Sequence, residues 1–136
     1  SPDGRTVAFV SLRDGGPRVY RIGIGGGGEA RVGTGALKEG APAFLPSGEL
    51  LYGVERSRNS REWRIVRSGS GAPTPLFDTE QPLLSLSTSR DGERVVYVTV
   101  RGNRPEYRVF LRPLAPPAPA VPLRPRQGEQ VSSASF

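Results

Sequence analysis

Three arginines in one short stretch give the chain its clearest capacity for chemistry. Arg56, Arg58 and Arg61 lie within "ERSRNSREWRIVR", where Ser and Asn, which favour turns, separate them. The guanidinium group is always charged and donates paired hydrogen bonds to carboxylates and phosphates. Glu55 and Glu62 offset part of the charge, so a solvated hairpin rim is the favoured interpretation. The functional alternative is a site for an anion or an acidic partner at the hairpin tip, formed by these three arginines.

The composition excludes several kinds of catalysis. The chain has 136 residues and contains neither His nor Cys, so Ser-His-Asp triads, thiol nucleophiles, disulfides and sites with His or Cys ligands cannot form within it. Its 13 acidic residues show no calcium-loop or glycosidase pattern. Asp78 and Glu80 could bind a cation, but a loop between strands explains them adequately. We expect no enzymatic activity, no cofactor and no metal.

Two further patterns have structural explanations. Gly23, Gly25 and Gly28 match the spacing of a dinucleotide-binding loop, but the following "EARVGTGALKEGAP" is too short and glycine-rich for the helix that such a loop requires. A hairpin tip is the favoured interpretation. The net charge of +6 raises the question of nucleic acid. Lys38 is the only lysine and aromatic residues for base stacking are scarce, so we expect no specific nucleic-acid binding.

Short strands, rather than helices, must position these residues. Hydrophobic residues make up 35% of the chain, and 18 Gly and 14 Pro are spread through it. This composition favours many strands joined by turns. No apolar stretch is long enough to cross a bilayer. The length fits one domain, residues 1–136.

A repeated turn organises the chain. "SPDGRTVAFVS" at the start returns as "SRDGERVVYVT", and "LPSGELLYGVE" is a weaker copy between them. The interval between Gly4, Gly48 and Gly92 is 44 residues each time (4 to 48 and 48 to 92). These glycines can take positive φ in a tight turn.

The residue before each of these glycines can stabilise the turn. Asp3 and Asp91 can accept backbone hydrogen bonds across it, and Ser47 can do the same more weakly. The middle copy is one residue shorter than the others between its glycine and the aromatic residue that follows, so we expect a local bulge or register difference there.

Each turn introduces the same series of strands. The first are apolar on both faces, as in strands covered from both sides, and span Thr6–Ser11, Leu50–Glu55 and Arg94–Val100. Triplets of an aromatic residue, Arg and a β-branched residue follow, with Tyr20, Trp63 and Tyr107 predicted to be equivalent blade-core residues. Weaker strands are expected at 29–34, 74–79 and 120–125, and the Pro residues of the last two suit sheet edges. With the segment before the next turn, each unit has four strands, the signature of a β-propeller blade.

The turn and the strands that follow it resemble the TolB-type propeller repeat, whose hallmark is a Ser-Pro-Asp-Gly turn. Residues 1–4 have the full motif, 89–92 lack the proline and 46–48 keep only its outline. The resemblance implies an all-β fold of three four-stranded blades, approximately 1–44, 45–88 and 89–136, permuted by one strand. Relatives occur in periplasmic translocation proteins, peptidase gating domains and bacterial sensors. The resemblance therefore implies a fold more strongly than it implies a function. It also implies a periplasmic or other extracytoplasmic location.

Three blades should not close a ring alone, because propellers need four to eight. We expect two chains to form a six-bladed ring, in which residues 130–136 of each complete the first blade of the other. Val131, Ser133, Ala134 and Phe136 are the predicted exchange residues. The alternative is that the chain is a piece of a longer propeller.

The predicted function is non-enzymatic. A ring of this kind would bind a protein, a peptide or a small ligand over one face or in the central channel. Two alternatives remain open: an accessory gating domain of a larger hydrolase or sensor, or a scaffold whose only property is assembly. We expect no membrane span.

Overall fold

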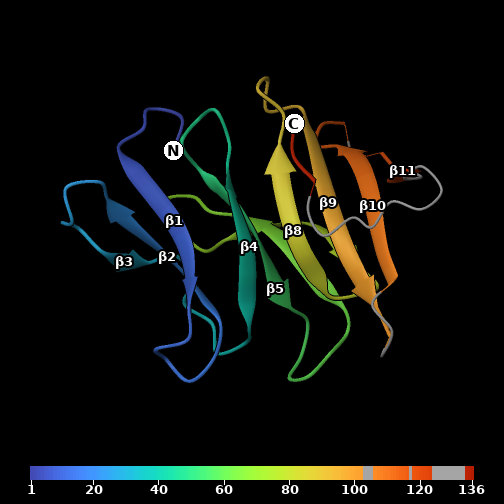
Figure 1. The fold of residues 1–136 in the computed structure, drawn as a ribbon, viewed down its shortest axis with the longest axis horizontal. Coiled ribbons are helices and arrows are strands. Elements are labelled where there is room, and N and C mark those ends of the chain that lie inside the picture. The colour runs from blue at the N-terminus through green and yellow to red at the C-terminus, as the bar shows by residue number, and fades with distance from the viewer. Residues whose placement is uncertain (103–105, 117, 124–133) are drawn as a thin grey trace.

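The chain is all-β in the computed structural model, which describes residues 1–102, 106–116, 118–123 and 134–136 (Figure 1). The described residues form three antiparallel sheets in which strands adjacent in sequence are also adjacent in space. None of the described residues forms a helix long and apolar enough to cross a membrane.

Each sheet corresponds to one predicted unit. The first sheet has three strands, β1 (Thr6–Ser11), β2 (Arg18–Gly23) and β3 (Ala30–Arg31). The second has four, β4 (Glu39–Phe44), β5 (Leu50–Glu55), β6 (Trp63–Arg67) and β7 (Thr74–Thr79). The third also has four, β8 (Leu83–Thr88), β9 (Arg94–Arg101), β10 (Glu106–Pro113) and β11 (Val121–Leu123). Among the described residues, no strand pairs with the free edge of β1.

Most strand positions are as predicted. The bounds of β1 and β5 match the prediction, and β9 is one residue longer than expected. The Pro-containing strands β7 and β11 lie at sheet edges, where Pro75 and Pro122 remove no interior hydrogen bond. The glycine-rich segment at 23–28 joins β2 to β3, so the hairpin-tip interpretation is confirmed.

The predicted equivalence of Tyr20 with Trp63 and Tyr107 is wrong, although Trp63 and Tyr107 occupy matching positions in the second and third sheets. Tyr20 pairs with Phe9 on β1, and the corresponding pair in the third sheet joins residues 97 and 110 rather than involving Tyr107. The first hairpin is two residues shorter between these paired positions (9 to 20 against 97 to 110). Pairing with the preceding strand, rather than distance from the turn, decides which face a side chain occupies. Trp63 is nonetheless a core residue, half-buried against the cluster described below.

The shorter middle copy does carry an irregularity, as predicted. The pairing of β4 with β5 shifts between Gly40 and Ala43, and Ala41 between them has a φ of 51°. A similar shift between Leu83 and Ser85 interrupts the pairing of β8 with β9. The bulge is therefore not unique to the shorter copy.

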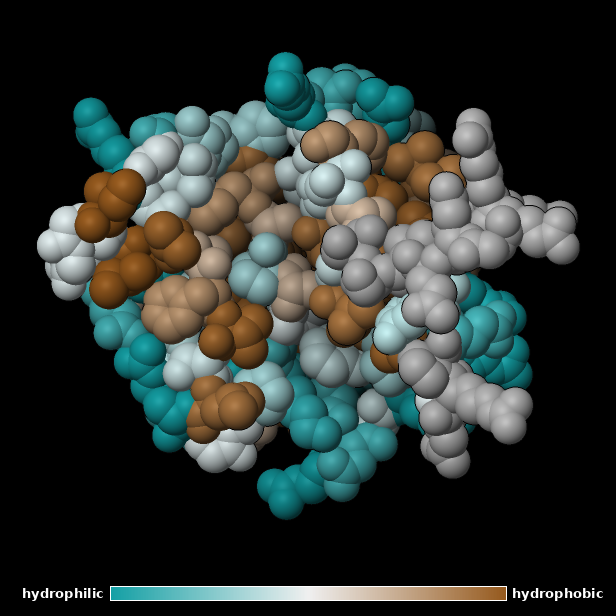
Figure 2. Space-filling view, in the orientation of Figure 1, coloured by the Kyte–Doolittle hydropathy of each residue, from teal (hydrophilic) through white to brown (hydrophobic). Residues whose placement is uncertain are grey.

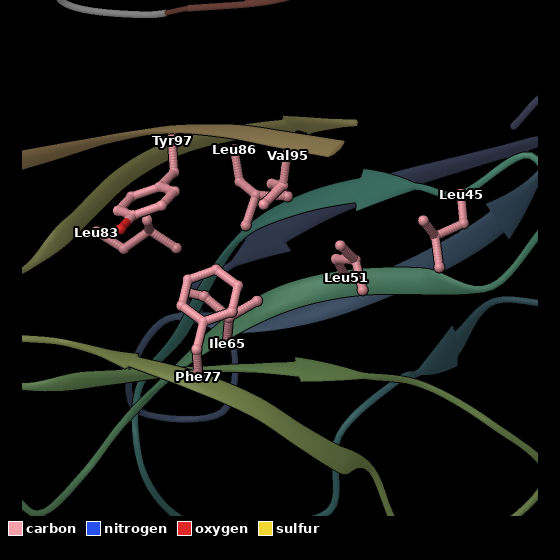
Figure 3. Packing of buried hydrophobic residues seen from close by; sticks show 8 residues of the cluster. All are labelled: Leu45, Leu51, Ile65, Phe77, Leu83, Leu86, Val95 and Tyr97. Atoms are coloured by element: carbon pink, nitrogen blue, oxygen red, sulfur yellow. The ribbon is translucent and has the colours of Figure 1, made fainter. Parts of the chain in front are cut away.

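The hydrophobic core lies between the sheets. Eight buried residues from the facing sides of the second and third sheets form the largest cluster, and Figure 3 shows them pointing toward one another: Leu45, Leu51, Ile65, Phe77, Leu83, Leu86, Val95 and Tyr97. A smaller cluster joins the first and second sheets: Val19, Leu50, Tyr52 and Val66. Strands β1, β4 and β8 lie side by side (Figure 1), and Thr88 Oγ1 donates a hydrogen bond of 2.5 Å to the Phe44 carbonyl. The sheets are thus stacked like the blades of an arc.

Candidate functional site

The three glycine turns lie along one edge of the arc (Figure 1), which we call the turn edge. In each turn the glycine amide donates to the carbonyl three residues earlier, at 3.0 Å for Gly4 and 2.9 Å for Gly48 and Gly92. Their φ angles of 69°, 86° and 73° lie in the left-handed region that favours glycine. The turn prediction is confirmed at all three positions.

The residue before each glycine acts as predicted. The backbone amide two residues on donates to Asp3 at 3.1 Å and to Asp91 at 3.0 Å, but to Ser47 at 3.4 Å. Hydroxyl hydrogen bonds from Ser1 and Ser89, and then these amides, hold the pKa of the two aspartates below its usual range. The carboxylates are therefore engaged within their own turns, which makes the turns structural.

The fold separates the predicted arginine site into parts. Arg56 forms an ion pair with Asp78 on β7. Asp78 also accepts hydrogen bonds from Arg64, at 2.8 Å from Nε and 3.2 Å from the terminal nitrogen. These hydrogen bonds, together with the nearby positive charges, lower the pKa of Asp78. Arg56 is thus paired within its own sheet. Across the described residues, no group of three or more acidic side chains could hold a metal ion.

Arg58, by contrast, faces a cavity of about 520 Å³ between the first two sheets, at the edge opposite the turns. Lys38, Glu55 and Asn59 also line this cavity. The Lys38 ammonium is 3.6 Å from the buried Glu55 carboxylate and 3.3 Å from the Asn59 side-chain oxygen. Arg61 is exposed and does not line the cavity. The structure therefore places one of the three predicted arginines at this cavity, while Arg56 lines a separate cavity of about 280 Å³.

Sequence reasoning missed a buried carboxylate between the first two sheets. Glu39, at the start of β4, is 1% exposed. Its Oε2 accepts a hydrogen bond of 3.0 Å from the Val19 amide, and its Oε1 is 3.4 Å from the Arg31 guanidinium. A Cβ at Gly33 would overlap this carboxylate, so the glycine leaves room for it. The only sequence signal is an acidic residue directly before an inner strand, which does not distinguish it from a surface residue.

The face of the first sheet that points away from the second carries apolar side chains, and the Arg13 guanidinium lies over them, 4.4 Å from the centroid of the Tyr20 ring. Side chains alternate along β1, so Phe9 lies on the face opposite Ala8, which packs toward the second sheet. Phe9 stacks on Tyr20 with ring centroids 5.8 Å apart, and neighbouring Val7 is 50% exposed. Figure 2 shows apolar side chains gathered on this side of the molecule. We call this the first-sheet outer face.

The third sheet has a matching apolar face at the other end of the arc. Val96, Val98 and Val109 form a cluster on the side opposite the main core, and Ala134 packs against it. The Phe136 amide donates to the Ser87 hydroxyl at 3.4 Å. We call this the third-sheet outer face. Of the predicted exchange residues, Ala134 and Phe136 therefore contact it, whereas Val131 and Ser133 lie outside the described residues.

Comparisons with known proteins identify the fold. The chain superposes on TolB from Acinetobacter baumannii with a TM-score of 0.71 and 21% identity, covering 92% of this chain and 31% of that one. It superposes on a putative TolB from Agrobacterium tumefaciens with a TM-score of 0.73 and 22% identity, covering 90% and 46%. An uncharacterized protein of Agrobacterium fabrum is 27% identical over 100 residues, which are 73% of this chain and 34% of that protein. No family model matches the chain.

The predicted structural resemblance to TolB is confirmed. The chain has the fold of a TolB-like propeller segment, and at these identities the similarity establishes the fold alone. It spans about a third of the length of the curated relative that it matches.

Proposed function

We propose that the chain is an arc of a non-catalytic propeller, which is complete only when further blades cover its two outer faces. A second copy of the chain supplies these blades. The observation that carries this proposal is the pair of apolar outer faces at opposite ends of the arc. Val7 is 50% exposed on the first-sheet outer face, whereas Val96, Val98 and Val109 on the third-sheet outer face are at most 7% exposed. The exposed apolar residue on the first sheet favours association.

The position of the C-terminal residues supports strand exchange. Ala134 and Phe136 lie against the third sheet, beside β8, as β8 lies beside β4. The innermost strand of a fourth blade would occupy this position. The first sheet lacks such a strand among the described residues, and the unpaired edge of β1 could accept one from a partner. Reciprocal exchange would give six blades around a two-fold axis.

The mass in solution tests the proposal. We expect light scattering to give twice the chain mass of 14.6 kDa, and deletion of residues 130–136 to give a smaller species. Phe9→Glu should also prevent association, because it places a charge on the first-sheet outer face. Ala72→Glu, in an exposed loop of the second sheet, is the matched control and should leave the mass unchanged.

A wild-type protein that stays a folded monomer would overturn closure by a second copy. It would favour the alternative, in which the neighbouring blades belong to the same longer polypeptide, as in an accessory domain of a hydrolase or sensor. The partial coverage of the relatives supports this alternative.

A second proposal concerns binding at the opposite edge. The cavity between the first two sheets is lined by the cationic Arg18, Lys38 and Arg58 and by the acidic Asp14 and Glu55. The excess of positive charge suits an acidic peptide. A fluorescein-labelled oligoglutamate peptide should bind, and Arg58→Gln should weaken its binding. Arg101→Gln, at the same edge on the third sheet, should not. Equal losses in the two variants would indicate non-specific attraction by net charge and would contradict the site.

A further inference from the structure

A second cleft opens between the first two sheets at the turn edge. Its volume is about 310 Å³, near the lower end of the range for small-molecule sites. Strands β1 to β3 supply one wall, and residues from β4 to the loop after β6 supply the other. Both walls belong to one chain, so the cleft exists whether or not a second copy closes the ring.

Two arginines give this cleft its charge. Arg21 and Arg31 both line it. Arg21 forms none of the ion pairs found between described residues. Arg31 contacts Glu39 through a terminal nitrogen at 3.4 Å, yet its Nε is buried and has no hydrogen-bond partner within the described part of the chain. This buried Nε is closed to the cleft, so Arg21, which is exposed on β2, offers the more accessible guanidinium.

The acidic side chain in the lining does not neutralise both arginines. Asp3 lines the cleft, but its carboxylate accepts hydrogen bonds from the Ser1 hydroxyl and, at 3.1 Å, from the Arg5 amide. Its lowered pKa keeps it ionised at neutral pH. Arg31 pairs with Glu39, and Asp3 is engaged within its own turn, so the positive charge available to a ligand in the cleft comes mainly from Arg21.

Polar residues such as Ser47 and Ser68 make up much of the remaining lining, but one part of it is apolar. Val32, Phe44 and Leu50 line the cleft beside the arginines. We propose that this cleft binds a small carboxylate with a short apolar body, whose carboxylate takes the hydrogen bonds offered by Arg21 and Arg31. Guanidinium groups match the planar, two-oxygen acceptor of a carboxylate. The apolar body would lie against the three apolar residues.

Benzoate is the probe, and ligand-observed proton NMR is the measurement. We expect benzoate to bind, and neutral benzamide of the same shape to bind much more weakly. Arg21→Gln should weaken benzoate binding roughly tenfold, as expected for the loss of a charged hydrogen bond. Arg21 is exposed on β2, so the variant should fold. Arg61→Gln removes the same charge elsewhere and should bind benzoate as the wild type does.

Four results would overturn the proposal. Equal binding of benzoate and benzamide would show that charge plays no part. An unchanged affinity in Arg21→Gln, or an equal loss in Arg61→Gln, would show that this cleft is not the site. Displacement of benzoate by a lower concentration of inorganic phosphate would contradict a carboxylate as the ligand. None of these results depends on the mass of the assembly.

Discussion

The two interfaces between sheets are built differently. The second and third sheets meet through eight buried residues, none of them charged, and Phe77 packs on Tyr97 with ring centroids 5.5 Å apart. The first and second sheets meet through only four buried apolar residues. Around these lie buried charged groups, Glu39, Glu55 and Arg18, and a cavity opens at each edge.

The difference indicates that the two interfaces have different roles, one in stability and the other in binding. Apolar burial stabilises by roughly 25 cal/mol per Å², whereas a buried ion pair contributes little net stability once its desolvation is counted. The buried Arg18 forms no ion pair with a described residue, and its guanidinium instead donates to the Ala36 carbonyl at 2.7 Å, in the segment between the first two sheets. The apolar interface should therefore provide most of the stability, and the polar interface should provide the binding sites.

Truncation in the apolar interface should have the largest effect. Leu51 is fully buried in the main cluster. Leu51→Ala should lower the free energy of unfolding by about 2–5 kcal/mol, through lost burial and the cavity left behind. Urea denaturation followed by circular dichroism measures this change. Ile24→Ala, at a residue 75% exposed, is the control, and similar losses in both variants would contradict the assignment of the core.

Loss of charge in the polar interface should have a smaller effect. Glu39→Gln keeps a side-chain oxygen that can accept from the Val19 amide but removes the charge that faces Arg31. We expect destabilisation of about 2 kcal/mol, reduced from the usual figure for a buried pair because Arg31 is partly exposed.

The matched control is Glu29→Gln, since Glu29 pairs with Arg13 at the surface. Its effect should stay below about 1 kcal/mol in the same denaturation assay. If the two glutamine variants were equally stable, the buried carboxylate would have no special part in joining the sheets.

Alkaline pH should also weaken the polar interface. Burial, followed by the nearby negative charge of Glu39, raises the pKa of Tyr52 to about 12. The unfolded chain has a tyrosine pKa of about 10, so it releases the proton first as the pH rises. The stabilisation is complete below pH 10 and is lost between about pH 10 and pH 12.

Replacement of this tyrosine isolates its contribution. Between pH 9 and pH 11 the wild type should lose about 1 kcal/mol more stability than Tyr52→Phe. Denaturation curves at the two pH values measure the difference. Tyr97→Phe serves as the comparison at the apolar interface, where burial also raises the pKa. Parallel losses in the wild type and Tyr52→Phe would argue against this role for Tyr52.

The smallest effect should come from repairing the middle turn. Ser47→Asp restores the residue found in the other two turns, whose amide hydrogen bonds are shorter. We expect a gain of a few tenths of a kcal/mol, typical of improved turn chemistry. Thermal unfolding would detect it, and a lower midpoint would indicate that the Glu49 carboxylate beside Ser47 repels the new charge.

Local signals in the sequence were enough to predict the strands and turns. Gly48 and its two counterparts fix the turns, and the apolar runs after them fix β1, β5 and β9, because turn geometry and strand patterning depend on adjacent residues. The equivalence of Tyr20 and Tyr107 failed because hairpin length, which spacing from the turn does not reveal, sets the register. Glu39 and the two clefts depend on contacts between sheets, which no local pattern encodes.

Hydrogen exchange of the backbone amides, followed residue by residue under native conditions, tests the contrast between the interfaces most directly. We predict that amides of β5, β6 and β9 exchange only through global unfolding, whereas those of β1 and β2 exchange through a separate opening of lower free energy. If the amides of β1 and β2 were as strongly protected as those of β9, the two interfaces would be equally strong and the difference in their roles would be contradicted.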